Sequence, residues 1–122
     1  MTAVLRAIRG ATTLDADTPE QVHERTRALI AAILEQNALS SEDLVSVLFT
    51  VTPDIHAGFP ATAARSLGLD DVPLLGALEM AVDGALERCV RVLVHCYTER
   101  ARGDLRHVYL EGATVLRRDL AR

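Results

Sequence analysis

The sequence is poor in the residue types that mark several large classes of protein. Tryptophan is absent, and only two Phe and two Tyr occur among 122 residues, so the chain offers no row of aromatic side chains on which bases could stack. The 13 Lys and Arg residues are outnumbered by 17 Asp and Glu, which gives a net charge of −4 and no basic block. Because nucleic-acid binding needs a positive footprint, we expect no nucleic-acid partner.

The lack of long hydrophobic runs and of a disulfide pattern indicates where the protein works. No run approaches the roughly 18 apolar residues of a membrane helix, so we expect no membrane partner. The opening residues, MTAVLRAIRGATT, carry arginines among their apolar positions and do not resemble a signal peptide. Cys89 and Cys96 fall in one predicted strand with opposite parity, so a disulfide between them is geometrically poor. Reduced thiols without an export signal predict a cytoplasmic protein.

Motifs for the common catalytic chemistries are also missing. The histidines and cysteines show neither C-x-x-C nor H-x-x-x-H spacing, so no metal site is predicted. No serine lies in a nucleophile elbow, and no glycine pattern forms a phosphate-binding loop. A cysteine inside a strand lacks the access and the activating helix terminus that thiol catalysis needs. We therefore expect no metal, no cofactor and no covalent nucleophile.

The hydrophobic pattern predicts a single domain of the α+β class over residues 1–122. Strands are expected at residues 3–10, 44–52, 72–80 and 87–97, with two more short strands around Gly112 in residues 106–117. A long helix is expected at residues 18–37, a short helix at 59–68 and a helical turn at 82–88. The sum is a mixed sheet of about five strands packed with one long helix and short helices. One helix leaves part of such a sheet uncovered, so we expect oligomerisation to cover it.

The helix at residues 18–37 is the best-marked element. Thr18 is the expected N-cap, Pro19 is the expected first helical residue, and Gln21 stands where it could close a capping box. Apolar side chains recur at helical spacing in a stripe that should face the sheet: Val22, Leu29, Ile30, Ile33 and Leu34.

Several charged residues do not fit their apolar surroundings. Arg9, Arg65, Arg91 and Arg117 lie in or beside apolar segments, and each could extend its charged end to the surface. Arg91 is the hardest to explain in that way, because apolar residues flank it on both sides and a guanidinium cannot lose its charge.

Glu79, in the segment LLGALEM, raises the same difficulty with the opposite sign. It could be a structural ion-pair partner of one of the arginines. Tyr109 could be a half-buried core residue, although its hydroxyl still needs a partner. Forked cations, a carboxylate and a phenol in apolar settings suit a small, anionic, oxygen-rich ligand that carries a hydroxyl group.

Six stretches spread in order over nearly the whole chain form a specific set of motifs. They are IRGATT (8–13), TPDIHAGFPA (52–61), VP (72–73), EM (79–80), CVRVLV (89–94) and RHVYLEGATVLRRDL (106–120). In these stretches the chain resembles the small, monofunctional, trimeric bacterial chorismate mutases with a pseudo-α/β-barrel fold. The resemblance implies a homotrimer with active sites between adjacent subunits. It also implies a Claisen rearrangement of chorismate to prephenate, in phenylalanine and tyrosine biosynthesis.

The resemblance also implies a role for individual residues of this sequence. Arg91 would be the main electrostatic catalyst, beside the ether oxygen of the substrate, and Glu79 would accept a hydrogen bond from the ring hydroxyl. Arg9 and Tyr109 would hold the side-chain carboxylate. The other expected substrate contacts are apolar walls at Phe59, Ala61 and Leu116, backbone groups of Leu75 and Gly76, and rim cations at Arg65 and Arg117.

Three features depart from the family pattern. Gly76 stands where the family often has a cysteine whose thiol addresses the substrate hydroxyl, and Thr62 stands where a lysine is common. The sequence ends at Arg122, so a tail that folds over the site is expected to be very short. We expect activity with weaker substrate capture.

Two other interpretations stay open from the sequence alone. The chain could be a non-catalytic trimeric module that binds a small carboxylate, or a structural subunit whose arginines and Glu79 form interface salt bridges. An ion-pair network has no need of a phenol and a phenylalanine wall at these positions, which favours the enzyme.

Overall fold

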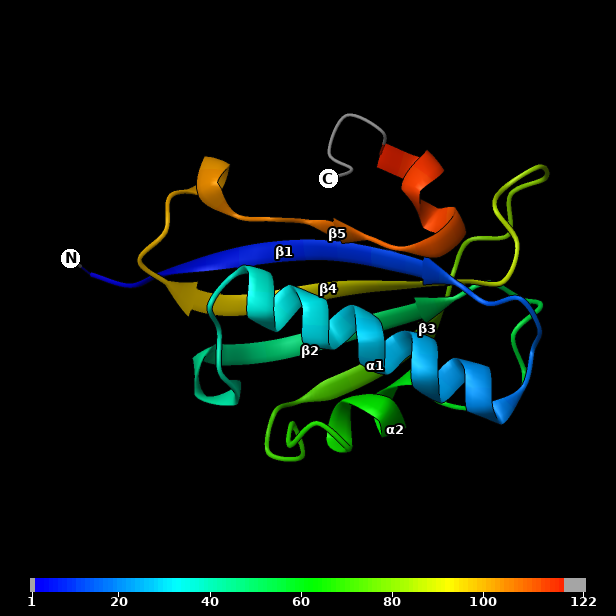
Figure 1. Cartoon of the computed structure of the whole chain (residues 1–122), viewed down its shortest axis with the longest axis horizontal. Helices are drawn as coiled ribbons and strands as arrows, with labels where there is room; N and C mark the ends of the chain where they lie inside the picture. The colour runs from blue at the N-terminus through cyan, green and yellow to red at the C-terminus, as the bar shows by residue number, and fades with distance from the viewer. Residues whose placement is uncertain (1, 118–122) are drawn as a thin grey trace.

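The computed structural model describes residues 2–117 and shows a mixed sheet with one long helix across one face (Figure 1). In their order across the sheet, the strands are β3 (Leu74–Leu78), β2 (Leu44–Val51), β4 (Cys89–Thr98), β1 (Val4–Thr13) and β5 (Val108–Tyr109). The helices are α1 (Pro19–Gln36), α2 (Pro60–Arg65) and the short 3₁₀ helices η1 (Ser41–Asp43), η2 (Arg102–Asp104) and η3 (Glu111–Arg117). The predicted α+β class is confirmed. Within residues 2–117, no helix has the length and apolar character needed to cross a membrane.

β4 is the central strand, and its alternation decides which side chains face the helix. It runs antiparallel to β1 on one side and to β2 on the other. Val90 and Val94 are buried in the core beneath α1, whereas Arg91 projects from the opposite face. Cys96 belongs to that core and Cys89 to a separate cluster, so the two free thiols diverge as predicted.

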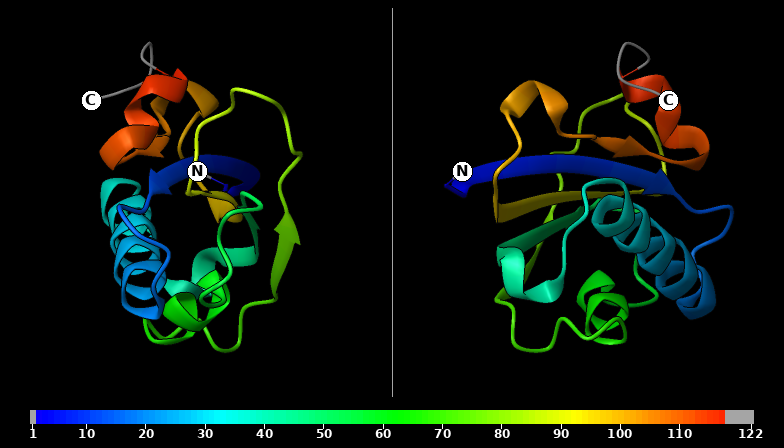
Figure 2. Two further views of the ribbon diagram at one scale, coloured as in Figure 1. Left: turned by 90° about the vertical axis from the view of Figure 1, so that its right-hand side faces the viewer. Right: turned by 60° about the vertical axis from the view of Figure 1, so that its left-hand side comes forward.

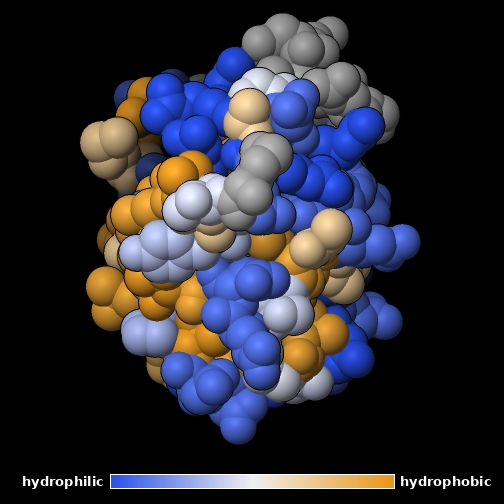
Figure 3. Space-filling model, turned by 90° about the vertical axis from the view of Figure 1, so that its left-hand side faces the viewer, coloured by the Kyte–Doolittle hydropathy of each residue, from blue (hydrophilic) through white to orange (hydrophobic). Residues whose placement is uncertain are grey.

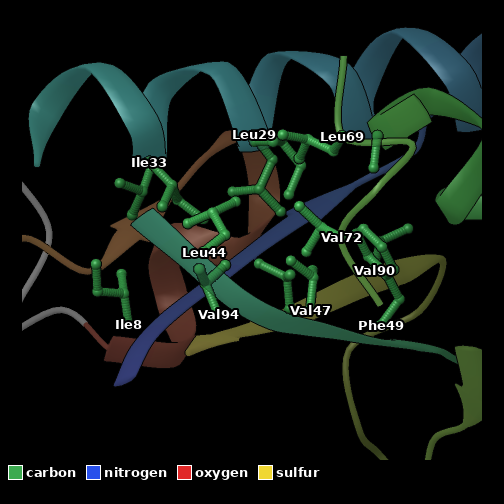
Figure 4. Packing of buried hydrophobic residues seen from close by; sticks show 14 of the residues in the cluster. Ile8, Leu29, Ile33, Leu44, Val47, Phe49, Leu69, Val72, Val90 and Val94 are labelled. Carbon is green, nitrogen blue, oxygen red and sulfur yellow. The ribbon is translucent and has the colours of Figure 1, made fainter. Parts of the chain in front are cut away.

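The main core lies between α1 and the sheet. In Figure 4 the side chains of Leu29 and Ile33 reach from α1 toward Val47 and Val94 of the sheet. The predicted stripe is buried, except that Leu34 at its edge is only partly so. Burial of each such side chain stabilises the fold by about 1.5–3 kcal/mol, so this stripe is what fixes α1 on the sheet.

Thr18 caps α1 as predicted, but Gln21 does not close a capping box. The Thr18 hydroxyl oxygen accepts a hydrogen bond from the Gln21 N–H at 3.1 Å. The Thr18 N–H donates to the Ala16 carbonyl at 3.0 Å, so it is not available to Gln21. The Gln21 side chain instead accepts from the Asp15 N–H at 2.8 Å and ties the β1–α1 loop to the helix.

Two segments differ from the prediction in extent or in type. The first strand continues past Gly10 to Thr13, because its pairing with β4 extends over its full 10 residues. Residues 82–88 form no helical turn. Instead, the Ala85 N–H donates to the Val82 carbonyl at 3.1 Å, which closes a single β-turn before β4 begins.

The last predicted strand, after Glu111, is a 3₁₀ helix instead. Glu111 has a φ of 53°, which turns the chain out of strand geometry. The Gly112 N–H donates to the Thr13 hydroxyl at 2.9 Å, and the Ala113 N–H donates to the Leu110 carbonyl at 3.0 Å. These bonds fold η3 against the end of β1, so the prediction of a second short strand after Gly112 is wrong.

On the sheet face away from α1, η3 packs over Ala11 and Cys89, and the face is exposed farther along β1 and β4 in residues 2–117. Figure 2 shows α1 and α2 lying on the same side of the curved sheet. On the open face, Leu5 of β1 lies opposite Tyr97 of β4, and their exposed fractions are 51% and 52%. Figure 3 shows hydrophobic surface gathered along one flank at the end where β1 begins. Apolar side chains are therefore exposed to solvent on this part of the sheet.

Gly10 allows α1 to pack closely against β1. A Cβ atom at this position would lie 2.9 Å from Ile33 Cδ1 and 3.0 Å from the Val108 carbonyl oxygen.

We expect Gly10→Ala to lower the free energy of unfolding by about 1–3 kcal/mol, because α1 and β5 must both move away from β1 to make room for the added Cβ. Gly103→Ala is the control, since within residues 2–117 its added Cβ meets no atom within 4 Å apart from its own chain neighbours. Urea unfolding measures both variants, and equal stability of the two would contradict the prediction.

Candidate active site

A cavity of about 320 Å³ opens on the uncovered face of the sheet. Six of the residues predicted from the sequence line it: Arg9, Glu79, Arg91, Tyr109, Leu116 and Arg117. The remaining wall consists of Gly10, Ala11, Leu48, Thr50, Val92 and Leu93. Three arginines against one carboxylate make the cavity cationic, although the whole chain carries a net charge of −4. Such a cavity attracts a small anion.

Strand register brings two of the cations to one wall. Ala11 lies opposite Arg91 in the pairing of β1 with β4, and Arg9 lies opposite Leu93. Because paired residues in an antiparallel sheet project from the same face, Arg9 and Arg91 are diagonal neighbours there. The Arg91 side chain is 53% exposed, so it borders the cavity and is not buried in the core.

Glu79 follows β3 directly and is held beside Arg91. Its N–H donates to the Val51 carbonyl at 2.9 Å, which fixes its backbone against β2. Its Oε1 lies 3.4 Å from Arg91 Nε and accepts a hydrogen bond from the Thr50 hydroxyl at 2.8 Å. Its Oε2 accepts from the Met80 N–H at 3.2 Å. The carboxylate is therefore oriented by contacts on both of its oxygens.

Tyr109 and Leu116 reach the cavity from the carboxy-terminal part of the described chain. β5 runs parallel to β1 and places Tyr109 opposite Ala11. Both side chains pack against a small buried cluster formed by Ala11, Cys89 and Ala113. η3 thus contributes a wall of the cavity, whereas the predicted strand would have continued along β1.

Asp54 anchors the backbone just before β4. Its carboxylate accepts hydrogen bonds from the Arg88 N–H, at 2.9 Å, and from the Thr52 hydroxyl. Desolvation would raise the pKa of Asp54, but the bonds from Thr52 and from the Arg88 backbone, together with the Arg88 charge, lower it below its usual value. The ionised carboxylate fixes the entry of the strand that carries Arg91.

The other five predicted substrate contacts do not line this cavity. Phe59 and Gly76 border a second hollow of about 410 Å³, between β3 and the loop before α2. Ala61 packs at the edge of the main core, Arg65 is exposed at the end of α2, and Leu75 is 66% exposed on β3. Within one chain, the Arg91 cavity is therefore lined by only some of the predicted site residues.

The loop that carries Phe59 is anchored, although the side chain itself is exposed. The Asp17 carboxylate accepts hydrogen bonds from the N–H groups of His56 and Ala57 at 2.8 and 3.1 Å. Phe59 nevertheless has an exposed fraction of 81%. The loop therefore presents a large apolar side chain to solvent at a fixed position. The predicted tail beyond residue 117 lies outside the described residues.

The sequence prediction missed the part of the cavity wall that comes from β1 and β2. Ala11, Leu48 and Thr50 line the cavity, and Thr50 also touches Glu79. Alternation in residues 44–52 places Leu48 and Thr50 on one face, but only the strand order shows that this face is the one that carries Arg91.

Comparison with known proteins agrees with this geometry. The family model for chorismate mutase type I matches residues 5–120. The chain belongs to this family. It is 48% identical over 118 residues to Chorismate mutase AroH of Thermus thermophilus, covering 96% of this chain and 97% of that protein. It is 44% identical over 119 residues to Chorismate mutase AroH of Bacillus subtilis (strain 168), covering 97% and 94%.

A solved structure agrees with the sequence relatives of this type I chorismate mutase. The chorismate mutase from Clostridium thermocellum superposes with a TM-score of 0.89 at 43% sequence identity. The match covers 90% of this chain and 98% of that chain. The sheet and its helices are therefore those of the family.

The chorismate mutase chain holds a thiol beside the cavity, but the thiol is not set up as a nucleophile. Cys89 is 3% exposed and packs against Ala11. Burial raises the pKa of the Cys89 thiol, although the nearby Arg91 charge opposes the rise. A protonated thiol is a poor nucleophile, so the charged groups and the phenol are left to act on a ligand.

His107 fixes the backbone that carries Arg9. Its Nδ1 accepts a hydrogen bond from the Arg9 N–H at 2.9 Å. Burial lowers the pKa of His107, and the positive charges of Arg9 and Arg117 lower it further. The folded chorismate mutase therefore favours the neutral ring.

We expect His107 to make the stability pH-dependent. In the unfolded chain its pKa is about 6.5, so below that pH the unfolded state binds the proton more readily than the folded state. The stabilisation is complete above about pH 6.5 and is lost as the pH falls further toward the lowered pKa of the folded state. His107→Asn keeps an acceptor that does not titrate. Urea unfolding from about pH 7 to about pH 5.5 should show a smaller loss of unfolding free energy in this variant. A profile identical to wild type would contradict the prediction.

Proposed function

We propose that the protein is a cytoplasmic chorismate mutase, a single domain over residues 1–122 that converts chorismate to prephenate in phenylalanine and tyrosine biosynthesis. The observation that carries the proposal is the Arg91 guanidinium, which lines a cationic cavity and lies 3.4 Å from Glu79. Chorismate is a small dianion with a ring hydroxyl. Three arginines, a carboxylate and a phenol offer a partner to each of its polar groups.

The rearrangement requires no nucleophile, proton transfer or metal, because it is pericyclic and unimolecular. The enzyme holds the enolpyruvyl arm over the ring, which supplies part of the rate enhancement. It also stabilises the charge that grows on the ether oxygen as the C–O bond stretches, and Arg91 supplies a fixed cation for that oxygen. An acceleration of about 10⁶-fold corresponds to about 8 kcal/mol. Orientation together with two or three charge-assisted hydrogen bonds is of this order.

The other residues of the cavity bind and orient the substrate. Glu79 accepts a hydrogen bond from the ring hydroxyl while its Oε1 stays paired with Arg91. Arg9 and Tyr109 bind the side-chain carboxylate, and both line the same cavity. An apolar wall and a rim cation come from Leu116 and Arg117.

A second copy of the chain completes the site, in a homotrimer with a pseudo-α/β-barrel arrangement. Two observations support this assembly: five of the predicted site residues do not line the Arg91 cavity within one chain, and the open part of the sheet face exposes Leu5 and Tyr97. In the trimer, one subunit closes the Arg91 cavity of its neighbour with Phe59, Ala61, Arg65, Leu75 and Gly76. Among the described residues, none but the chain neighbours of Gly76 comes within 4 Å of a Cβ added there, so this position leaves space for a larger side chain.

Arg91→Lys should remove most of the turnover and leave the fold intact. An ammonium group cannot reproduce the planar fork that spans the ether oxygen and a carboxylate, so we expect kcat to fall by about 10²–10³-fold. Loss of the ultraviolet absorbance of chorismate measures the rate. Arg102→Lys, on the exposed η2, is the matched control and should keep the wild-type rate. Near-normal turnover of Arg91→Lys would rule out Arg91 as the catalyst. Binding without conversion by the wild-type chain would instead identify a carboxylate-binding module.

Mixed oligomers test whether two subunits share each site. Arg91→Ala removes the catalytic cation, and Phe59→Asp places a negative charge where the neighbour's dianionic substrate would bind. Each variant alone should be nearly inactive. When the two chains are co-expressed, about a quarter of the sites combine two intact walls, so about a quarter of the wild-type activity should return. Activity no higher than the mean of the two parent variants would show that each site lies within one chain.

A further inference from the structure

Thr50 lies in β2, between the two strands beside it, β3 and β4, and next to the ion pair of Arg91 with Glu79. In the sheet it is opposite Arg91 of β4 on one side and opposite Ala77 of β3 on the other. Paired residues project from the same face, and Thr50 lines the same cavity as Arg91. A β-branched side chain in a paired strand has restricted χ1 freedom, so the hydroxyl of Thr50 is a rigid donor.

This hydroxyl joins the carboxylate to the neighbouring strand. It donates to Oε1 of Glu79 at 2.8 Å, and the same oxygen lies 3.4 Å from Arg91 Nε. Oε2 accepts from the N–H of Met80 at 3.2 Å, a contact within the same stretch of backbone. The bond from Thr50 therefore ties the Glu79 carboxylate to β2.

The arrangement matters because Arg91 is not fixed by burial. Its side chain is 53% exposed, whereas that of Glu79 is 20% exposed. A half-exposed arginine has considerable rotamer freedom, and a solvent-accessible ion pair orders it only weakly unless its partner is held in place. Glu79 has several rotatable bonds of its own, so it can orient Arg91 only when its carboxylate is oriented in turn.

We propose that Thr50 is a positioning residue for the rearrangement. Its hydroxyl holds the Glu79 carboxylate in the orientation that presents Arg91 to the ether oxygen. The inference rests on the proposed function. Because the charge on that oxygen grows only in the transition state, the effect of Thr50 falls on kcat more than on KM.

Substitutions at position 50 separate the hydroxyl from the shape of the side chain. Thr50→Val keeps the branching and removes the donor, and we expect kcat to fall about tenfold, with KM changed less than about threefold. Thr50→Ser restores the donor and should recover most of kcat. Thr12→Val is the matched control, because the buried Thr12 hydroxyl has no hydrogen-bond partner among the described residues and faces away from the cavity. This control should keep the wild-type kcat.

A double-mutant cycle tests whether Thr50 acts through Glu79. In a Glu79→Ala background, Thr50→Val should change kcat by less than about twofold, because no carboxylate is left to position. An unchanged kcat in Thr50→Val, or an equal loss in both backgrounds, would overturn the inference. If the wild-type chain fails to convert chorismate, it is the proposed function that fails.

A second measurement does not depend on turnover. The Nε–H group of Arg91 reports its surroundings in ¹H–¹⁵N NMR spectra. We expect this signal to shift in Thr50→Val and to stay in place in Thr12→Val, because only the former releases the carboxylate next to Nε. An unshifted signal in Thr50→Val would overturn the proposed link between Thr50, Glu79 and Arg91, whatever the activity of the enzyme.

Discussion

The ion pair between Arg91 and Glu79 is the interaction on which the site depends. It joins Arg91 of β4 to the residue that directly follows β3, and β2 lies between these two strands. The pair therefore forms only when three strands keep their register, and a slip by one residue would turn every side chain of a strand to the other face. Burial of Val90 and Val94 beneath α1 prevents such a slip. One face of β4 thus borders the hydrophobic core, and its other face borders the charged cavity.

The chemistry explains why the sequence carries no common catalytic signature. A pericyclic reaction asks the protein for orientation and for a cation beside one oxygen, and neither need produces a distinctive short motif. The cavity accordingly contains side chains that also occur in ordinary ion pairs and cores. The thiol of Cys89, beside the cavity, is buried, and its pKa is raised. Motifs spread along the chain, taken together, indicated the family where single residues did not.

Features set by local pattern could be predicted from the sequence, and features set by distant contacts could not. The stripe of α1 and the alternation around Arg91 follow from spacing of 3.6 and 2 residues, and the cap at Thr18 follows from a threonine placed before Pro19. η3 depends on the bond from Gly112 to Thr13, 99 positions away, and no local pattern encodes that bond. Thr50 was missed for the same reason, because strand order decides what it faces. Gln21 shows a further limit. Its position suits a capping box with Thr18, but its side-chain oxygen accepts a hydrogen bond from the Asp15 N–H instead.

The separation of Phe59 from the Arg91 cavity has a thermodynamic consequence. Under the proposed assembly, a protomer released by dilution would keep the Arg91 cavity but lose the wall that its neighbour supplies. Dissociation of the oligomer would therefore remove catalytic activity. Specific activity would then depend on protein concentration, as expected when folded function cannot be separated from association. A substrate that bridges two subunits binds only the assembled state. By mass action it would hold the oligomer together at dilutions where the empty protein dissociates.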